Sequence, residues 1–126
     1  MTHEASAERA YEYFCEGLTS GRWGSFFDLL AAEVDLLWPY PPNAGEYTGA
    51  DGRDKLIEFC GQLGGEGNRL TDIDVICRTV GDESVVFEDH SQGVFGGQPY
   101  DGRHCVILTM RDEQVIGFRE YTAPAG

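Results

Sequence analysis

The chain has 126 residues, enough for one domain with its own core, and we expect residues 1–126 to form that single domain. Its net charge of −13 argues against binding to nucleic acid or anionic membranes, because both need clustered lysine and arginine. No run approaches the roughly 18 apolar residues of a membrane span, and no export signal is visible, so we expect a cytoplasmic protein.

The first half of the chain predicts three helices. Apolar residues at helical spacing indicate one helix over residues 5–20 and a short second helix after Ser25. Asp51 is a helix cap, and the helix that it begins is expected to end near residues 64–65.

The second half predicts strands. Apolar, β-branched and aromatic runs alternate there with Gly, Pro, Asp and Glu turns, which is typical of consecutive antiparallel strands. The runs are long for an ordinary domain, so the sheet should bend. Including two runs from the first half, the predicted strands cover residues 33–38, 46–48, 70–80, 85–90, 104–110 and 115–121.

Helices segregated from a contiguous sheet indicate an α+β fold. We expect a cone, in which three N-terminal helices pack on a strongly curved antiparallel or mixed sheet. A curved sheet that carries a few carboxylate and imidazole groups among apolar residues is where a small-molecule pocket is expected.

The chain carries several short motifs: Gly21-Arg22-Trp23, Phe26 with Leu29-Leu30, the strand ending at Trp38, Gly49-Ala50-Asp51-Gly52-Arg53, and Arg119-Glu120-Tyr121. Together these motifs resemble the cystatin-like α+β cone, the group that includes nuclear transport factor 2, ketosteroid isomerases and SnoaL-like polyketide cyclases. The resemblance covers nearly the whole chain and is specific for the fold, which hosts enzymes, binders and transport factors alike.

Within this group, two segments are most similar to the phenazine-biosynthesis A/B-type proteins. They are Trp38-Pro39-Tyr40-Pro41-Pro42 and Arg119-Glu120-Tyr121-Thr122-Ala123-Pro124. The resemblance implies that Glu120 lies in the pocket and handles protons.

Three departures argue against steroid-type isomerase chemistry. The position of the aspartate base in ketosteroid isomerases is Trp38 here, and the two oxyanion-hole positions fall on Phe14 and near Ile107. All three are apolar. The acidic triplet of limonene-epoxide-hydrolase-type enzymes is not evident either.

The residues themselves also favour Glu120 as a pocket residue. Strand alternation places it on the same face as Ile116 and Phe118. A carboxyl group in an apolar pocket has a raised pKa, which suits proton transfer near neutral pH. The alternatives are the opposite register, or a structural ion pair with an arginine.

His90 and Glu88 share one face of their strand and form a candidate acid/base pair, or else a solvated outer face. The same alternation, with Ile107 inside, predicts that His104 faces outward. No metal site is expected from these residues, because their spacing matches no ligand motif.

The remaining candidate site residues are expected to form the pocket wall. Tyr40 adds a hydroxyl that can assist catalysis, although plain core packing is an equal alternative for Tyr40 and Trp38. The predicted catalytic residues are Glu120, His90 and Tyr40, and the predicted substrate-binding residues are Phe14, Trp38, Phe59, Glu88, Ile107 and Phe118.

No cofactor is predicted. The cysteines Cys15, Cys60, Cys77 and Cys105 form no C-x-x-C pair and are read as small buried hydrophobic residues, and no glycine cluster has phosphate-loop spacing.

The leading hypothesis is a cofactor-free enzyme that cyclises, isomerises or condenses an apolar, cyclic or conjugated carbonyl compound by proton transfer. The alternatives are a non-catalytic module or dimeric scaffold that binds an apolar ligand, and a hydrolase that uses a pocket water. We also expect a homodimer, because the strands from residue 70 to residue 121 are apolar on both faces.

Overall fold

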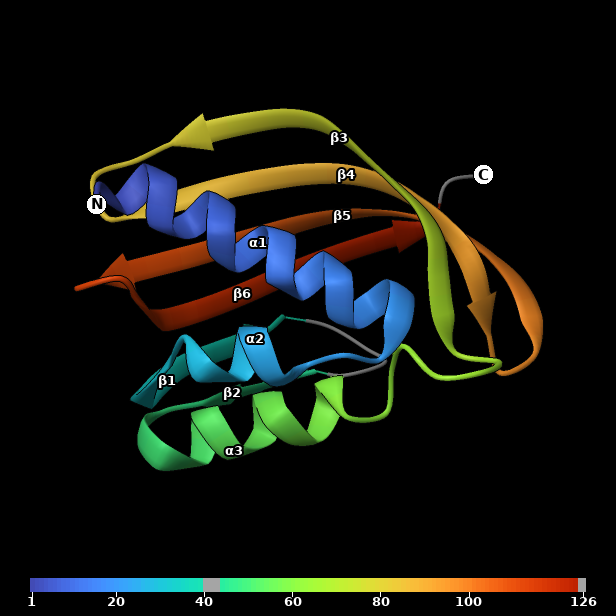
Figure 1. Ribbon diagram of the computed structural model, residues 1–126, viewed down its shortest axis with the longest axis horizontal. Coiled ribbons are helices and arrows are strands. Elements are labelled where there is room, and N and C mark those ends of the chain that lie inside the picture. Colours follow the sequence, from blue (N-terminus) through green and yellow to red (C-terminus); the bar gives the residue numbers. More distant parts are fainter. Residues whose placement is uncertain (40–43, 125–126) are drawn as a thin grey trace.

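The computed structural model describes residues 1–39 and 44–124, and these form an α+β cone (Figure 1). The sheet is mixed and open: its strands run in the order β2-β1-β6-β5-β4-β3, and the only parallel pair among them in the described residues is β1 with β6. The elements are α1 (His3–Ser20), α2 (Gly24–Asp28), β1 (Leu30–Trp38), β2 (Gly45–Tyr47), α3 (Gly49–Cys60), β3 (Arg69–Val80), β4 (Ser84–Phe95), β5 (Gln98–Arg111) and β6 (Gln114–Pro124).

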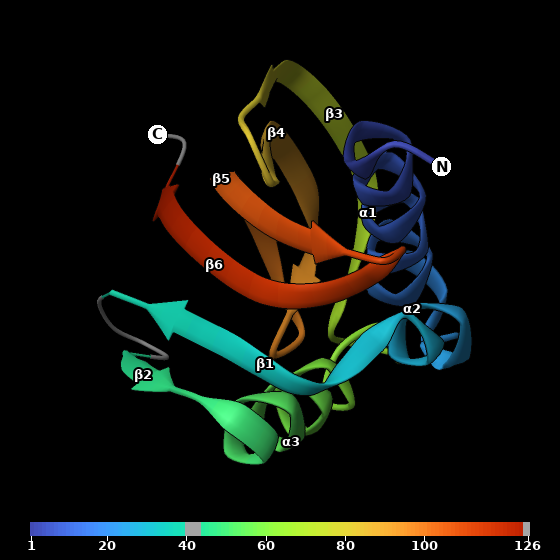
Figure 2. The same ribbon diagram turned by 90° about the vertical axis from the view of Figure 1, so that its left-hand side faces the viewer.

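The sheet bends around α1, which lies across its concave inner face (Figures 1 and 2). The Thr2 hydroxyl caps this helix by accepting a hydrogen bond from the Ala5 N–H at 3.1 Å, and Gly21 ends it with a φ of 78°. Burying a large apolar side chain contributes about 1.5–3 kcal/mol, so the buried stripe of α1 anchors the helix to the sheet. That stripe comprises Ala7, Ala10, Tyr11, Phe14 and Leu18.

The helix α3 packs against β1 at very short range. A Cβ atom at Gly52 would collide with the carbonyl oxygen of Val34, so only glycine permits this approach. Leu56 and Cys60 are buried beneath the helix, and Phe59 packs against Trp38 with ring centroids 4.7 Å apart. The segment after α3 also reaches the C-terminal end of α1, where Gly64 packs against Gly21.

The register of β4 and β5 corrects one prediction. Val106 and Leu108 are buried in the core, whereas Ile107 is half-buried on the convex outer face of the sheet. His104 has the register of Val106 and therefore faces inward, not outward. Alternation fixes which residues share a face but not which face is buried, and here both faces carry apolar side chains.

A bulge in β6 changes the alternation at the start of this strand. Thr109 pairs with Gly117 and Met110 with Val115, so one residue of β6 has no partner there. Val115 enters the core for this reason, while Ile116 is half-buried. Beyond Gly117 the alternation is regular, and Phe118 and Glu120 share the inner face.

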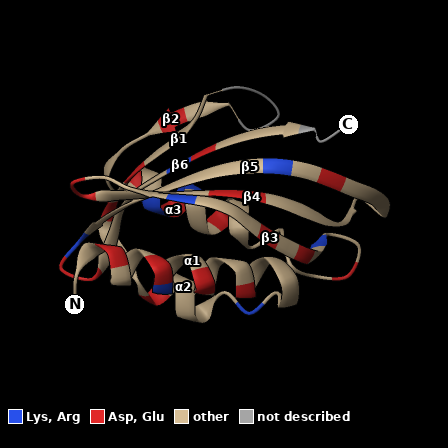
Figure 3. Cartoon of the chain, turned by 90° about the horizontal axis from the view of Figure 1, so that it is seen from above, with Lys and Arg blue, Asp and Glu red and all other residues tan. Residues whose placement is uncertain are grey.

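Acidic residues are spread along α1 and the sheet (Figure 3). Among the described residues no helix is both long and apolar enough to cross a membrane.

Candidate functional site

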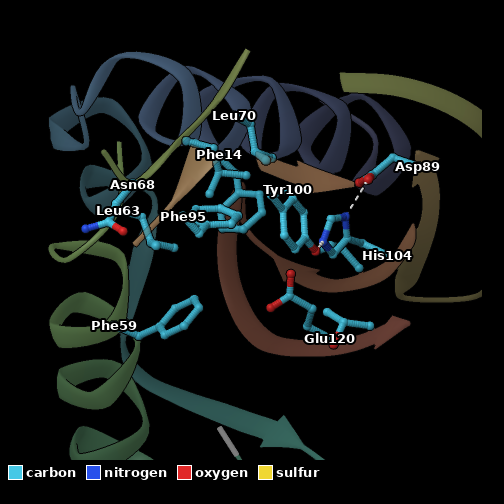
Figure 4. Close-up of a pocket in the computed structure, with 13 residues that line it drawn as sticks. Phe14, Phe59, Leu63, Asn68, Leu70, Asp89, Phe95, Tyr100, His104 and Glu120 are labelled. Atoms are coloured by element: carbon cyan, nitrogen blue, oxygen red, sulfur yellow. Dashed lines mark hydrogen bonds and ion pairs between the residues drawn. The ribbon is translucent and has the colours of Figure 1, made fainter. Parts of the chain in front are cut away.

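A cavity of about 430 Å³ lies between the inner face of the sheet, the C-terminal half of α1 and the end of α3 (Figure 4). Pockets of roughly this size hold small organic molecules. Its walls divide into an apolar half and a polar half. The lining residues are Phe14, Leu18, Phe59, Leu63, Asn68, Leu70, Asp89, Phe95, Tyr100, His104, Val106, Glu120 and Thr122.

The polar half is built from neighbouring strands. Asp89 of β4 and His104 of β5 are directly paired in the sheet, and both point to the inner face. The Tyr100 ring folds back along β5 to reach His104, and a Cβ atom at Gly102 would collide with the Tyr100 hydroxyl. The glycine therefore makes room for the tyrosine.

These side chains form one hydrogen-bonded chain. The Tyr100 hydroxyl lies 2.7 Å from His104 Nε2, and His104 Nδ1 lies 2.7 Å from Asp89 Oδ1. Asp89 also accepts hydrogen bonds from the hydroxyls of Tyr11 and Ser91, each at 2.7 Å. With three partners, the Asp89 carboxylate is fixed in place.

Within this set of hydrogen-bonded side chains, the protonation states of Asp89 and His104 depend on each other. Burial alone would raise the pKa of Asp89, but hydrogen bonds from His104, Tyr11 and Ser91 outweigh it and hold the pKa below its usual value. Burial alone would lower the pKa of His104, but the hydrogen bond and charge of Asp89, with the charge of Glu120, raise it. The arrangement favours an imidazolium next to a carboxylate.

The charge of His104 decides what Tyr100 can do. When His104 is protonated, both of its N–H groups donate, one to Asp89 and one to the Tyr100 oxygen. The Tyr100 hydroxyl proton can then point to a ligand in the cavity. When His104 is neutral with its proton on Nδ1, Tyr100 donates to Nε2 instead. Burial, with the charges of nearby carboxylates, raises the pKa of Tyr100 to about 12, so the hydroxyl keeps its proton.

Glu120 lies on the wall next to Tyr100 and points into the same space (Figure 4). The Trp38 indole N–H donates to its Oε1 at 3.1 Å. Burial raises the pKa of Glu120, while the His104 charge and the Trp38 hydrogen bond act in the opposite direction. The net effect is a raised pKa, so this carboxyl group takes up a proton more readily than an exposed one.

The apolar half faces these groups across the cavity. Phe14 and Leu70 form its buried floor, and Phe59, Leu63 and Phe95 stand at its rim. Phe95 packs edge-on against Tyr100, with ring centroids 4.6 Å apart. The cavity therefore has an apolar wall opposite a polar one.

Of the predicted wall residues, Phe14 and Phe59 line the cavity. Trp38 and Phe118 are buried behind it, and Trp38 holds Glu120 by its indole. Ile107 lies on the outer face and cannot contact a ligand in this cavity.

The predicted pair His90 and Glu88 is also on the outer face. Glu88 is exposed, and His90 Nε2 lies 2.6 Å from Asp101 Oδ1. The residue between them, Asp89, faces the cavity, so the pair lies on the outer face, as in the alternative given for it above. Tyr40 lies outside the described residues.

The sequence analysis missed Asp89, Tyr100 and the inward placement of His104. One signal was present: Asp89 continues the alternation of Val85 and Phe87, His104 continues that of Val106 and Leu108, and a polar residue in a core register position has to be paired. Within residues 1–39 and 44–124, no group of three or more His, Cys, Asp or Glu side chains is arranged to hold a metal ion.

Comparison with solved structures shows several proteins with the same architecture. An NTF2-like protein from Anabaena variabilis ATCC 29413 is 26% identical, with a TM-score of 0.82, and the match covers 100% of this chain and 96% of that one. A proposed isomerase from Rhodopseudomonas palustris is 14% identical, with a TM-score of 0.77 and coverage of 94% and 90%. A proposed SnoaL-like polyketide cyclase from Jannaschia sp. CCS1 is 23% identical, with a TM-score of 0.69 and coverage of 93% and 84%.

The latter two share only the fold with this chain, because their identity is low. No family model matches the chain, and no curated protein matches it in sequence.

Proposed function

Because this chain belongs to the superfamily of SnoaL-like and NTF2-like proteins, we propose that it catalyses proton transfer on a small cyclic or conjugated carbonyl compound without a cofactor. One observation carries the proposal. Glu120 and the hydrogen-bonded chain of Asp89, His104 and Tyr100 converge on one end of an apolar cavity. A carboxylate beside a hydrogen-bond donor is the arrangement that enolisation of a ketone requires.

In the proposed reaction, the Glu120 carboxylate takes a proton from the carbon next to the carbonyl group. The electron pair of that C–H bond forms a C=C bond, and the carbonyl π electrons move to the oxygen. The Tyr100 hydroxyl donates a hydrogen bond to the resulting enolate oxygen. With a β,γ-unsaturated ketone, protonated Glu120 then gives its proton to the γ-carbon of the dienolate, which moves the double bond and gives isomerisation. Alternatively, the α-carbon of the enolate attacks a second carbonyl carbon, the π electrons of that carbonyl move to its oxygen, and protonated Glu120 gives its proton to this oxygen, which gives cyclisation.

The other hydrogen-bonded residues, His104, Asp89 and Tyr11, act on the substrate through Tyr100. The His104 imidazolium donates to the Tyr100 oxygen, which makes the hydroxyl a stronger donor to the enolate. Asp89 holds His104 in its charged form, and Tyr11 holds Asp89. His104, Asp89 and Tyr11 are therefore positioning residues in this proposal.

Exchange of the α-protons of 2-tetralone in D2O, followed by proton NMR, tests the proposal. We expect the protein to accelerate exchange over buffer, and Glu120→Gln to lose about 10²–10⁴-fold of that acceleration. Tyr100→Phe should lose about 10²–10³-fold. Glu88→Gln, which removes the same charge from the outer face, should exchange like the parent. A Glu120→Gln protein that exchanges as fast as the parent contradicts the proposal.

A non-catalytic binding module is the second candidate, and the apolar half of the cavity favours it, since binding needs no more than these walls. If the parent protein binds 2-tetralone but leaves its exchange rate at that of buffer, this reading replaces the first. A hydrolase is less favoured, because it needs two acidic groups that hold a water, and Asp89 already accepts three hydrogen bonds.

A further inference from the structure

The charges around the cavity are unbalanced in a way that bears on its ligand. Two carboxylates, Asp89 and Glu120, contribute to its wall, and among the described residues His104 is the one lining side chain that can carry a positive charge. That charge is already paired with Asp89 at 2.7 Å. The other polar side chains of the described wall, Asn68, Tyr100 and Thr122, carry no positive charge.

Lysine and arginine are absent from this wall in the described part of the chain. The remaining residues cannot supply one, because residues 40–43 read Tyr-Pro-Pro-Asn and residues 125–126 read Ala-Gly. Two basic side chains form ion pairs with surface residues: Arg78 pairs with Glu4 and Glu8 of α1, and Arg9 of α1 pairs with Glu113.

We infer that the cavity selects an uncharged substrate, a flat and mainly apolar ring compound with one carbonyl or hydroxyl oxygen at its polar edge and no phosphate, carboxylate or nucleotide-bearing group. An anionic group would lie beside Glu120 with no free cation to pair with, and burying an unpaired charge is strongly unfavourable. A single neutral oxygen fits the one donor, the Tyr100 hydroxyl, that the polar chain can present. This inference rests on the proposed function, because it names the substrate class of the same site.

The negative charge of the reaction then arises only inside the cavity. When Glu120 takes the proton it becomes neutral, and the enolate oxygen takes over the negative charge next to Tyr100 and His104. A substrate that already carried an anion would add a second negative charge at this stage. The charges of the side chains around the cavity therefore suit a neutral molecule that becomes an anion during the reaction.

The test compares two ligands of the same shape, 2-naphthamide and 2-naphthoate, at pH 7. The Trp38 indole N–H donates to Glu120, so its NMR signal reports on occupation of the polar end of the cavity. We expect 2-naphthamide to shift this signal in a saturable way and 2-naphthoate to bind at least tenfold more weakly. Naphthoate binding as tight as that of the amide, or no response to either ligand, overturns the inference.

Two variants separate charge from shape. Glu120→Gln keeps an oxygen for the Trp38 indole and removes one negative charge, so the preference for the amide over the carboxylate should shrink at least threefold. Glu88→Gln removes the same charge from the outer face, where Glu88 is exposed, and should leave the preference unchanged. Equal effects of the two variants would mean that the net charge of the protein, rather than the cavity, excludes anions, and this also overturns the inference.

The two proposals fail in different ways. If 2-tetralone exchange depends on Glu120 but the carboxylate binds as well as the amide, the proposed function stands and the neutral-substrate inference is wrong. If the amide is preferred but no exchange is accelerated, the preference for neutral ligands holds for a binding module and the catalytic proposal is wrong.

Discussion

The two faces of the sheet carry the same pair of groups in different surroundings. On the inner face, His104 Nδ1 lies 2.7 Å from Asp89, and the two side chains are 10% and 6% exposed. On the outer face, His90 Nε2 lies 2.6 Å from Asp101, and the exposures are 32% and 46%. Distance alone does not distinguish the two pairs.

Burial and further partners make the difference. The inner pair continues to Tyr100 on one side and to Tyr11 and Ser91 on the other, and it opens on a cavity. The outer pair adds a hydrogen bond from the Gln92 amide to Asp101 at 3.3 Å, and water screens the pair. A histidine next to a carboxylate therefore indicates a chemical site only where both groups are desolvated and connected.

The largest expected difference between the two pairs is the loss of stability when the carboxylate charge is removed from each. Asp89→Asn leaves a buried imidazole without its counter-charge, and we expect the free energy of unfolding to fall by about 3 kcal/mol. Asp101→Asn changes an exposed pair and should cause no measurable loss. Urea unfolding of the parent and both variants measures this, and equal losses would show that burial does not separate the pairs.

The second prediction concerns the space that lets Tyr100 reach His104. Gly102→Ala places a methyl group against the Tyr100 ring, and overpacking of this kind costs about 1–3 kcal/mol. Gly65→Ala is the matched control, because an added Cβ there has no atom within 4 Å. Thermal unfolding of both variants tests this. A Gly102→Ala protein as stable as Gly65→Ala, with unchanged 2-tetralone exchange, would mean that the Tyr100 position is not fixed by this contact.

The third prediction uses the pH dependence of the inner pair. The pKa of His104 is raised above its ordinary 6.5, so its contribution to stability is complete below pH 6.5 and is lost as the pH rises through the folded-state pKa. The pKa of Asp89 is lowered, so its contribution is present above about pH 3.8 and is lost only in acid.

We therefore expect the stability difference between the parent and His104→Gln to shrink between pH 6 and pH 8.5. The pKa of Glu120 is also raised, and the His104 charge opposes that rise, so the two proteins are compared on a Glu120→Gln background, where this coupling is absent. Denaturant titrations at four pH values measure the difference. A difference that grows with pH contradicts the assigned direction of the His104 shift.

Changes on the outer face are expected to have the smallest effect on the reaction proposed for Glu120. We propose that two copies of the chain pair through this face. The outer side chains of β4–β6 include Val86, Cys105 and Ile107, which are half-buried and apolar although they lie on the convex side. Light scattering should give about twice the mass of one 13.9 kDa chain. Ile107→Lys should reduce the measured mass to that of one chain and should leave the rate of 2-tetralone exchange nearly unchanged. A parent protein with the mass of one chain at micromolar concentration contradicts the proposal.

Much of the fold follows from local pattern. The helix over residues 5–20 was predicted within two residues of the observed α1, because its apolar spacing and Gly21 are both local signals. The strands β4 and β5 are longer than predicted, since Gly93 and Gly102 read as turns but lie within strands, where they permit close approach of neighbouring groups.

The placement of Glu120 on the cavity wall agrees with the alternation after Phe118. His104 was expected to face outward but lines the cavity, and Asp89 was not among the predicted site residues. A shift of one residue in register exchanges the two faces of a strand. In a sheet with apolar residues on both faces, the hydrophobic pattern of the sequence fits both registers almost equally well. The finer resemblance to phenazine-biosynthesis A/B-type proteins stays a prediction.

The sequence by itself determined the α+β class, the bent sheet and the presence of carboxylate and imidazole groups within apolar strands, because all of these depend on composition and spacing along the chain. Only the tertiary structure decided which imidazole is buried. The pairing of β4 with β5 places Asp89 beside His104, and α1 covers that face with Tyr11. Such pairings join residues far apart in sequence, and it is their desolvation that gives this histidine, and not His90, a place in a site.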